Sequence, residues 1–121
     1  LLFPGIPYEI DPRFREVDFG IFEMHSYDEL KDTSEYQAWL IGDNERNVPP
    51  EGESGQQMAS RVLAAFAQIK EDTCLVTHGG VIAAIMADLF PEEGKHRYQW
   101  QSPNGHGYCI MEDRYRAICF D

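Results

Sequence analysis

Basic residues and long apolar runs are scarce in this sequence. It has ten basic residues against twenty-one acidic ones, which gives a net charge of -11 at pH 7. A field of that sign repels nucleic-acid phosphates and anionic lipid, so we expect neither nucleic acid nor a membrane as partner. No apolar stretch approaches the ~20 residues that a membrane-spanning helix needs. The same field repels a small anionic ligand unless hydrogen-bond donors reverse the local charge inside a pocket.

Cysteine is also rare. The three cysteines, Cys74, Cys109 and Cys119, are odd in number and have no Cys-x-x-Cys spacing. All three lie in apolar, strand-like segments, so we expect buried, reduced thiols and a cytoplasmic protein. The sequence opens with Leu1 rather than methionine, so we expect the gene product to start upstream, and a missing signal peptide carries little weight.

Helix starts are indicated by three Ser-x-x-Glu/Gln spacings, in which the serine and the third residue after it cap the first turn. They occur at Ser26–Glu29, Ser34–Gln37 and Ser54–Gln57. The third precedes the strongest helical periodicity, with one apolar face made of Met58, Val62, Ala65, Phe66 and Ile69. A further helix is predicted from about residue 80 to 90, ended by Pro91. The sequence therefore predicts helices on both sides of residues 42–55, a segment rich in turn formers.

Four short segments have the composition of strands: residues 7–10, 74–77, 108–111 and 115–120. The last two are separated by a turn and predict a hairpin. Helices alternating with strands predict an α/β sandwich with a partly parallel sheet. A parallel sheet needs a central strand with both faces covered, and the sequence is one core strand short of that requirement.

The most informative segment is TCLVTHGGVI at 73–82, an apolar run that ends in His78, Gly79 and Gly80. It predicts a strand followed directly by a helix. In open α/β sheets ligands bind at that edge, and free N–H groups at a helix start favour an anion. Taken alone, the segment has a second interpretation. A histidine after a strand is often a structural hydrogen-bonding residue, and two glycines are a common connector.

Two other segments support the first interpretation. They are FREVDFGIFE at 14–23 and VPPEGES at 48–54, which is followed by Arg61 on the amphipathic helix. With LVTHGGVI at 75–82, these segments in this order resemble the histidine phosphatase superfamily, in the branch of phosphoglycerate mutase and its phosphatase relatives. The resemblance implies an α/β three-layer sandwich with a mostly parallel sheet, incomplete at the N-terminus. It implies that residues 1–121 are the C-terminal two-thirds of one domain.

The resemblance also implies a chemistry, in which a phosphoryl group passes through a phosphohistidine without metal or cofactor. It assigns His78 as the second histidine that holds the phosphoryl oxygens and Glu16 as the proton donor to the leaving oxygen. The Gly79 backbone is a further expected substrate contact. Glu23 competes with Glu16 for the role of the carboxylate. Glu53 is expected to anchor a loop rather than to catalyse.

The nucleophile of the family, in an Arg-His-Gly motif after the first strand, does not occur in this sequence. The remaining histidines, His25, His96 and His106, are expected to be surface or polar loop residues. The resemblance places the nucleophile and its strand upstream of Leu1, so the 121 residues alone are predicted to be inactive.

The expected function is a phosphatase that hydrolyses a small phosphomonoester, such as a phosphosugar, a phosphoglycerate-like acid or α-ribazole phosphate. Phosphoglycerate mutase and a non-catalytic phosphate-binding remnant are the alternatives. The expected partner is a small phosphorylated metabolite, and a second copy or a separate chain could supply the missing strand. An exposed strand edge favours such association.

Overall fold

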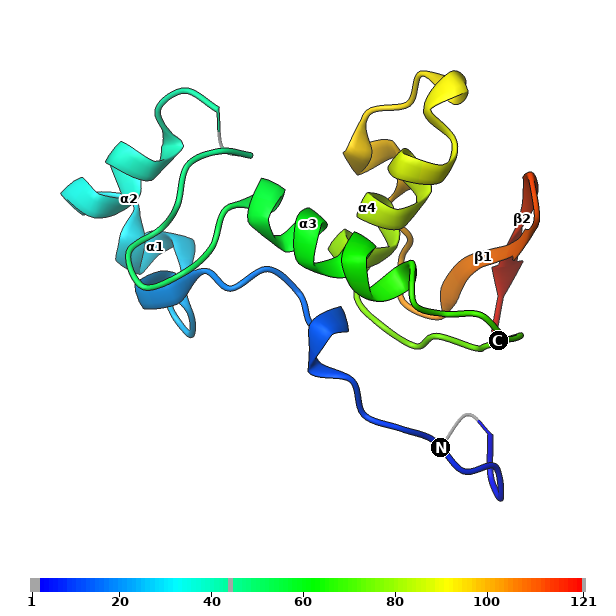
Figure 1. The fold of residues 1–121 in the computed structure, drawn as a ribbon. Coiled ribbons are helices and arrows are strands. Elements are labelled where there is room, and N and C mark those ends of the chain that lie inside the picture. Colours follow the sequence, from blue (N-terminus) through cyan, green and yellow to red (C-terminus); the bar gives the residue numbers. More distant parts are fainter. Residues whose placement is uncertain (1–2, 44, 121) are drawn as a thin grey trace.

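The computed structural model describes residues 3–43 and 45–120. Two helices, α3 and α4, lie side by side in the centre, with α1 and α2 at one end and a β-hairpin at the other (Figure 1). The elements are α1 (Tyr27–Leu30), α2 (Ser34–Leu40), α3 (Gly55–Phe66), α4 (Gly79–Leu89), β1 (His106–Met111) and β2 (Arg114–Cys119). Short 3-10 helices occupy Pro12–Phe14, Gly20–Phe22, Pro91–Glu93 and Arg97–Trp100.

Two of the three predicted helix caps are confirmed. The Ser26 and Ser54 side chains each accept a hydrogen bond from the third residue after them, and both form complete capping boxes. The prediction for α2 is wrong by one residue. Thr33, in extended backbone, accepts from the Tyr36 amide, whereas Ser34 is already helical and its hydroxyl donates to Glu35. The residue that keeps extended backbone before the first turn makes the cap.

The core lies between α3 and α4. The predicted face of α3 is buried at Met58, Val62 and Ala65 and packs against α4. The other side of α4 packs on the 3-10 helix Arg97–Trp100 and forms a second cluster around Trp100, which is fully buried. Because α4 is covered on two sides, its small residues Ala83 and Ala84 are buried together with Val81, Ile85 and Met86. Both clusters include partly buried side chains of the hairpin, so the hairpin closes the core.

The predicted hairpin is confirmed. Strands β1 and β2 pair antiparallel, with His106 opposite Cys119 and Met111 opposite Arg114, so Glu112 and Asp113 form a two-residue turn. Glu112 has a φ of 54°, as the first central residue of such a turn requires. The two strands begin one or two residues earlier than the sequence indicates.

The other two predicted strands are not found. Residues 7–10 and 74–77 have no regular secondary structure, and within the part of the chain that the structure describes the only sheet is the β1–β2 hairpin. A strand is defined by its ladder partner, and the described residues supply none for these segments. The described residues therefore form neither the expected parallel sheet nor its three layers. Val76 is consequently 67% exposed, although the apolar composition of its segment predicts that it is buried.

The cysteine side chains are also more exposed than the sequence predicts. Cys74 and Cys119 are exposed and Cys109 is half-buried, so the prediction of buried thiols is wrong for the first two. Cys74 lies in residues 74–77, which belong to no sheet among the described residues, and Cys119 is the last residue of β2. In the described ranges, no helix has the length and apolar character needed to span a bilayer.

Candidate functional site

A cavity of about 260 Å³ opens at the N-terminus of α4. It is lined by Glu16, Thr77, His78, Gly79, Ile82 and the segment 102–106. The cavity thus brings together the loop after the first 3-10 helix, the start of α4 and the turn before β1. All three residues expected from the sequence to form the site, Glu16, His78 and Gly79, lie in its wall.

His78 occupies the N-cap position of α4. Its backbone is extended (φ -106°, ψ 159°), and its carbonyl accepts the first helical hydrogen bond from the Ile82 amide at 3.0 Å. The imidazole makes no capping bond and is exposed. The side chain is therefore available to a ligand beside the positive end of an eleven-residue helix.

Glu16 is held against the same helix terminus. Its Oε2 atom accepts a hydrogen bond from the Gly80 amide at 3.0 Å, and its Oε1 atom accepts from the Val17 amide at 3.0 Å. The carboxylate is half-buried and lines the cavity. Glu23 instead accepts from the Phe19 amide at 2.9 Å and does not line the cavity. The geometry therefore favours Glu16 as the carboxylate of the site.

The loop that carries Glu16 is held by Arg61 of α3. The guanidinium donates to the carbonyl oxygens of Arg13 and Arg15, at 2.7 and 3.0 Å, and to the Glu16 carbonyl at 3.4 Å. It also forms an ion pair with Glu53, in which both side chains are at least four-fifths buried. The planar guanidinium group of arginine has five N–H donors, so one side chain can bind several carbonyl and carboxylate oxygens at once.

Glu53 extends this support to the next residues of the loop. Its Oε1 atom accepts from the Asp18 amide at 3.2 Å, and its own amide donates to the Asp18 carbonyl at 2.8 Å. Glu53 therefore anchors the loop, as the sequence predicts. On the other side, the Thr77 hydroxyl donates to the Phe14 carbonyl at 2.6 Å, which joins the loop to the residue before His78.

The two glycines at the start of α4 differ in what surrounds them. A Cβ atom on Gly80 would lie 2.9 Å from the Glu16 carboxyl carbon, whereas on Gly79 it would lie 2.9 Å from Cγ of Gln101. Gln101 is an exposed, flexible side chain that can move. The site therefore requires glycine at position 80, because only there does the carboxylate occupy the space of a side chain.

The cavity wall also contains His106, which the sequence analysis does not identify as a site residue. The motif NGHG at 104–107 predicts only a turn and an exposed histidine, and the structure confirms both. The turn folds back toward α4, however, so His106 lines the same cavity as His78. His106 lies 28 positions after His78, so no local pattern in the sequence reveals that both line one cavity. His25 and His96 are exposed, as predicted, and do not line the cavity.

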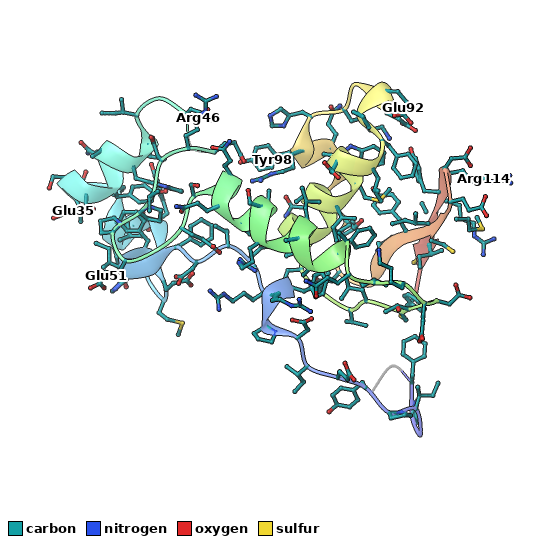
Figure 2. All side chains as sticks on the ribbon, in the orientation of Figure 1. Glu35, Arg46, Glu51, Glu92, Tyr98 and Arg114 are labelled. Carbon is teal, nitrogen blue, oxygen red and sulfur yellow. The ribbon has the colours of Figure 1, made fainter. Side chains whose placement is uncertain are left out.

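A second cavity, of about 380 Å³, lies beside the hairpin turn. Figure 2 labels two of its residues, Glu92 and Arg114, at the end of the molecule opposite to Glu35 and Glu51. Its wall carries Glu92, Glu93 and Asp113 against the single cation Arg114. An acidic wall repels phosphate, so the cavity at α4 is the better anion site.

Comparisons with known proteins identify the family of the chain. The sequence profile of the histidine phosphatase superfamily (branch 1) matches residues 2–117. The chain therefore belongs to this superfamily, whose fold is of the α/β class.

Among individual proteins, the chain is similar to the probable phosphoglycerate mutase GpmB of Enterobacter sp. (strain 638), with 34% identity over 91 residues. That match covers 70% of this chain and 42% of the relative. The chain is also similar to the adenosylcobalamin/alpha-ribazole phosphatase of Escherichia coli (strain K12), with 31% identity over 91 residues, 69% of this chain and 44% of the relative. The matched regions thus span less than half the length of these relatives.

Proposed function

We propose that this chain supplies the proton donor and part of the phosphate-binding wall of a phosphatase that hydrolyses a small phosphomonoester. The observation that carries the proposal is the Glu16 carboxylate, held 3.0 Å from the Gly80 amide in a cavity that His78 also lines. A phosphoryl group at this position would meet N–H donors, the helix terminus and an imidazole. These groups neutralise the charge on the equatorial oxygens during transfer.

In the proposed reaction, an imidazole nitrogen attacks phosphorus and the bond from phosphorus to the leaving oxygen breaks. Glu16 gives its proton to that oxygen, which leaves as an alcohol. Water then attacks the phosphorus of the phosphohistidine while Glu16 takes a proton from the water. The bond from phosphorus to the imidazole nitrogen breaks, so the histidine is regenerated and inorganic phosphate is released. His78 and the Gly79 amide hold the phosphoryl oxygens in both steps.

The nucleophilic histidine is proposed to come from a segment outside these 121 residues. That segment would end in Arg-His-Gly and would pair with the extended residues 73–77, completing a mostly parallel sheet in a three-layer sandwich. Residues 1–121 would then be the C-terminal two-thirds of one domain. The apolar side chain of Val76, now exposed, supports this pairing because a neighbouring strand and its covering helix would bury it.

A phosphatase is preferred to a mutase because, between the 3-10 helix Gly20–Phe22 and the start of α3 at Gly55, the described residues form two short helices, α1 and α2, and loops. This leaves little room for extra segments around the mouth of the site. The alpha-ribazole phosphatase among the relatives supports a hydrolase, and the probable mutases support the alternative. Product analysis separates the two, since a phosphatase releases inorganic phosphate and a mutase returns an isomeric phosphomonoester.

The test is the activity of the full-length protein on a panel of phosphosugars, phosphoglycerates and α-ribazole phosphate. Glu16→Gln and His78→Ala are expected to lower kcat about a hundred-fold or more, because each removes a transition-state contact. Glu23→Gln is the matched control and should retain activity. Near-normal turnover in both site variants would remove these residues from the mechanism.

The 121-residue chain by itself is proposed to lack this activity. Clear turnover of an aryl phosphate by purified 1–121, abolished by His78→Ala, would contradict that proposal. Phosphate binding without turnover in the full-length protein would instead support a non-catalytic binding role. We place the protein in the cytoplasm, where an exposed thiol such as Cys74 stays reduced.

A further inference from the structure

The turn before β1 contains the only Asn-Gly pair of the sequence, Asn104 and Gly105. Both residues are exposed, and both line the cavity at the start of α4. Asparagine is chemically labile, because the backbone nitrogen of the next residue can attack its side-chain amide and close a five-membered ring. Glycine lets that nitrogen approach most closely, since it has no side chain. The pair is therefore a candidate site of spontaneous deamidation.

Neither reacting group of this pair is engaged elsewhere. Among the described residues, no hydrogen bond uses the Asn104 carboxamide or the Gly105 N–H. Asn47 differs, because its carboxamide donates to two backbone carbonyl oxygens, at 2.8 and 2.6 Å, and its neighbour Val48 is branched. Deamidation is therefore expected at Asn104 and not at Asn47.

The imidazole of His106 contacts the peptide group that has to react. Its Nδ1 atom lies 3.0 Å from the Asn104 carbonyl oxygen, and a carbonyl oxygen only accepts, so Nδ1 carries the proton of this bond. That oxygen belongs to the same peptide group as the Gly105 N–H. When the Gly105 nitrogen loses its proton, the negative charge spreads onto this oxygen, where the Nδ1–H donor stabilises it. The neutral imidazole is sufficient for this effect.

The fold also keeps the labile glycine in place. Gly105 has a φ of +76°, as the third position of a type II turn requires, and the turn is closed by the His106 amide, which donates to the Pro103 carbonyl at 3.1 Å. A Cβ atom on Gly105 would lie 3.1 Å from the Phe120 carbonyl oxygen. A larger residue, which would slow the attack, is therefore disfavoured at position 105.

We propose that Asn104 is a deamidation site, that His106 accelerates the reaction, and that the product weakens phosphate binding in the cavity. In the first step the Gly105 nitrogen bonds to Cγ of Asn104, the bond from Cγ to Nδ2 breaks, and ammonia leaves with the proton that Gly105 has lost. Water then opens the succinimide ring by adding to one of its two carbonyls and breaking the bond from that carbonyl to nitrogen. The product at position 104 is aspartate or isoaspartate.

The effect on the cavity follows from the charge of this product. Deamidation adds a carboxylate to a wall in which Glu16 is the only carboxylate among the described lining residues. The chain already has a net charge of -11, and a further negative charge inside the cavity repels phosphate directly. This part of the inference rests on the proposed function, whereas the reaction at Asn104 does not.

The first test follows Asn104 in the folded full-length protein during incubation at neutral pH. Peptide mapping by mass spectrometry separates asparagine, aspartate and isoaspartate, and Asn47 in the same maps should stay intact. His106→Leu removes the donor and is expected to slow conversion about ten-fold, the size of a hydrogen bond to a charged group. His106→Asn places an N–H near the same position and should keep most of the parent rate.

Unfolded protein supplies the control for this comparison. In urea the turn is lost, so the parent protein and both His106 variants should convert at the same rate. The proposal is overturned if Asn104 stays intact in the folded parent protein, or if the folded parent and folded His106→Leu convert equally fast.

The second test measures the binding of inorganic phosphate to the full-length protein by calorimetry at low ionic strength. Asn104→Asp should weaken binding about five-fold, whereas Gln68→Glu, which adds the same charge at an exposed position outside the cavity, should not. Equal binding by the parent protein and Asn104→Asp would contradict the effect on the cavity. If the parent protein binds no phosphate, the proposed function and this effect fail together, and the first test alone decides the reaction at Asn104.

Discussion

The Oε2 atom of Glu16 lies 3.0 Å from the backbone nitrogen of Gly80, a residue 64 positions later in the chain. This hydrogen bond joins the loop before α1 to the first turn of α4. It places the proposed proton donor beside the helix terminus at which a phosphoryl group would bind.

Replacing Gly80 by alanine is expected to displace the Glu16 carboxylate, because the new Cβ would lie 2.9 Å from its carboxyl carbon. The kcat of the full-length enzyme should fall about ten-fold or more, because a displaced general acid loses part of its usual contribution to the rate. Gly107→Ala is the control, since its Cβ would meet no atom within 4 Å and Gly107 does not line the cavity. Steady-state kinetics of both variants check the prediction, and an equal loss in the two would contradict it.

The ion pair between Arg61 and Glu53 is expected to stabilise the loop that carries Glu16. Arg61→Met leaves a largely buried Glu53 carboxylate without its partner and frees three backbone carbonyls. The free energy of unfolding should fall by about 3 kcal/mol. Urea denaturation followed by circular dichroism measures the change.

Arg46→Met is the control for that experiment. Arg46 pairs with Asp43 at 3.4 Å, but its side chain is 77% exposed, and Figure 2 shows it projecting from the loop after α2. The loss of an exposed pair should change the unfolding free energy by less than about 1 kcal/mol. If both variants lose the same stability, Arg61 has no special role in holding the loop.

The phenol of Tyr115 is expected to titrate at unusually high pH. Its hydroxyl donates to the Glu93 carboxylate at 2.8 Å, and this bond, together with burial, raises the pKa of Tyr115. The folded state therefore favours the neutral phenol. The resulting stability is present below the ordinary tyrosine pKa of about 10 and is lost as the pH rises through the folded value.

Ultraviolet absorbance of tyrosinate, measured as the pH is raised, tests this effect. Glu93→Gln should lower the pKa of Tyr115 toward its usual range, because the negative acceptor is gone. Glu92→Gln, at the exposed neighbouring carboxylate, should not. The idea is wrong if the titration curve is the same in the Glu93 variant and the parent protein.

The extended segment 73–77 is expected to exchange its backbone amides rapidly in the 121-residue chain, because the described residues include no ladder partner for it. In a longer protein that supplies the proposed strand, the amides of residues 74–76 should be protected by at least about a hundred-fold. Hydrogen exchange read by mass spectrometry makes this comparison. Amides inside α3 serve as the internal reference, since they are bonded in both proteins. Equal exchange of residues 74–76 in the two proteins would argue against the pairing.

The sequence by itself determined the local structure of this protein. The serine caps, the apolar face of α3 and the hairpin are set by contacts within a few residues, and periodicity reveals such contacts directly. It also predicted Glu16, His78 and Gly79 as site residues, through three short motifs whose order resembles one superfamily, and the structure places all three in the wall of one cavity. The error at Thr33 shows the limit of such patterns, since two adjacent hydroxyl residues offered the same cap.

Only the tertiary structure decided which of these distant segments lie next to each other. It placed Glu16 rather than Glu23 beside α4, because the carboxylate that faces this helix depends on how Arg61 and Glu53 hold the loop. It brought His106 into the cavity through a turn whose direction no local spacing encodes. It also left residues 74–77 without a ladder partner among the described residues, although their composition is that of a buried strand. Burial and pairing are properties of a whole sheet, and a segment's own residues specify its preference for a strand but not the neighbour that completes it.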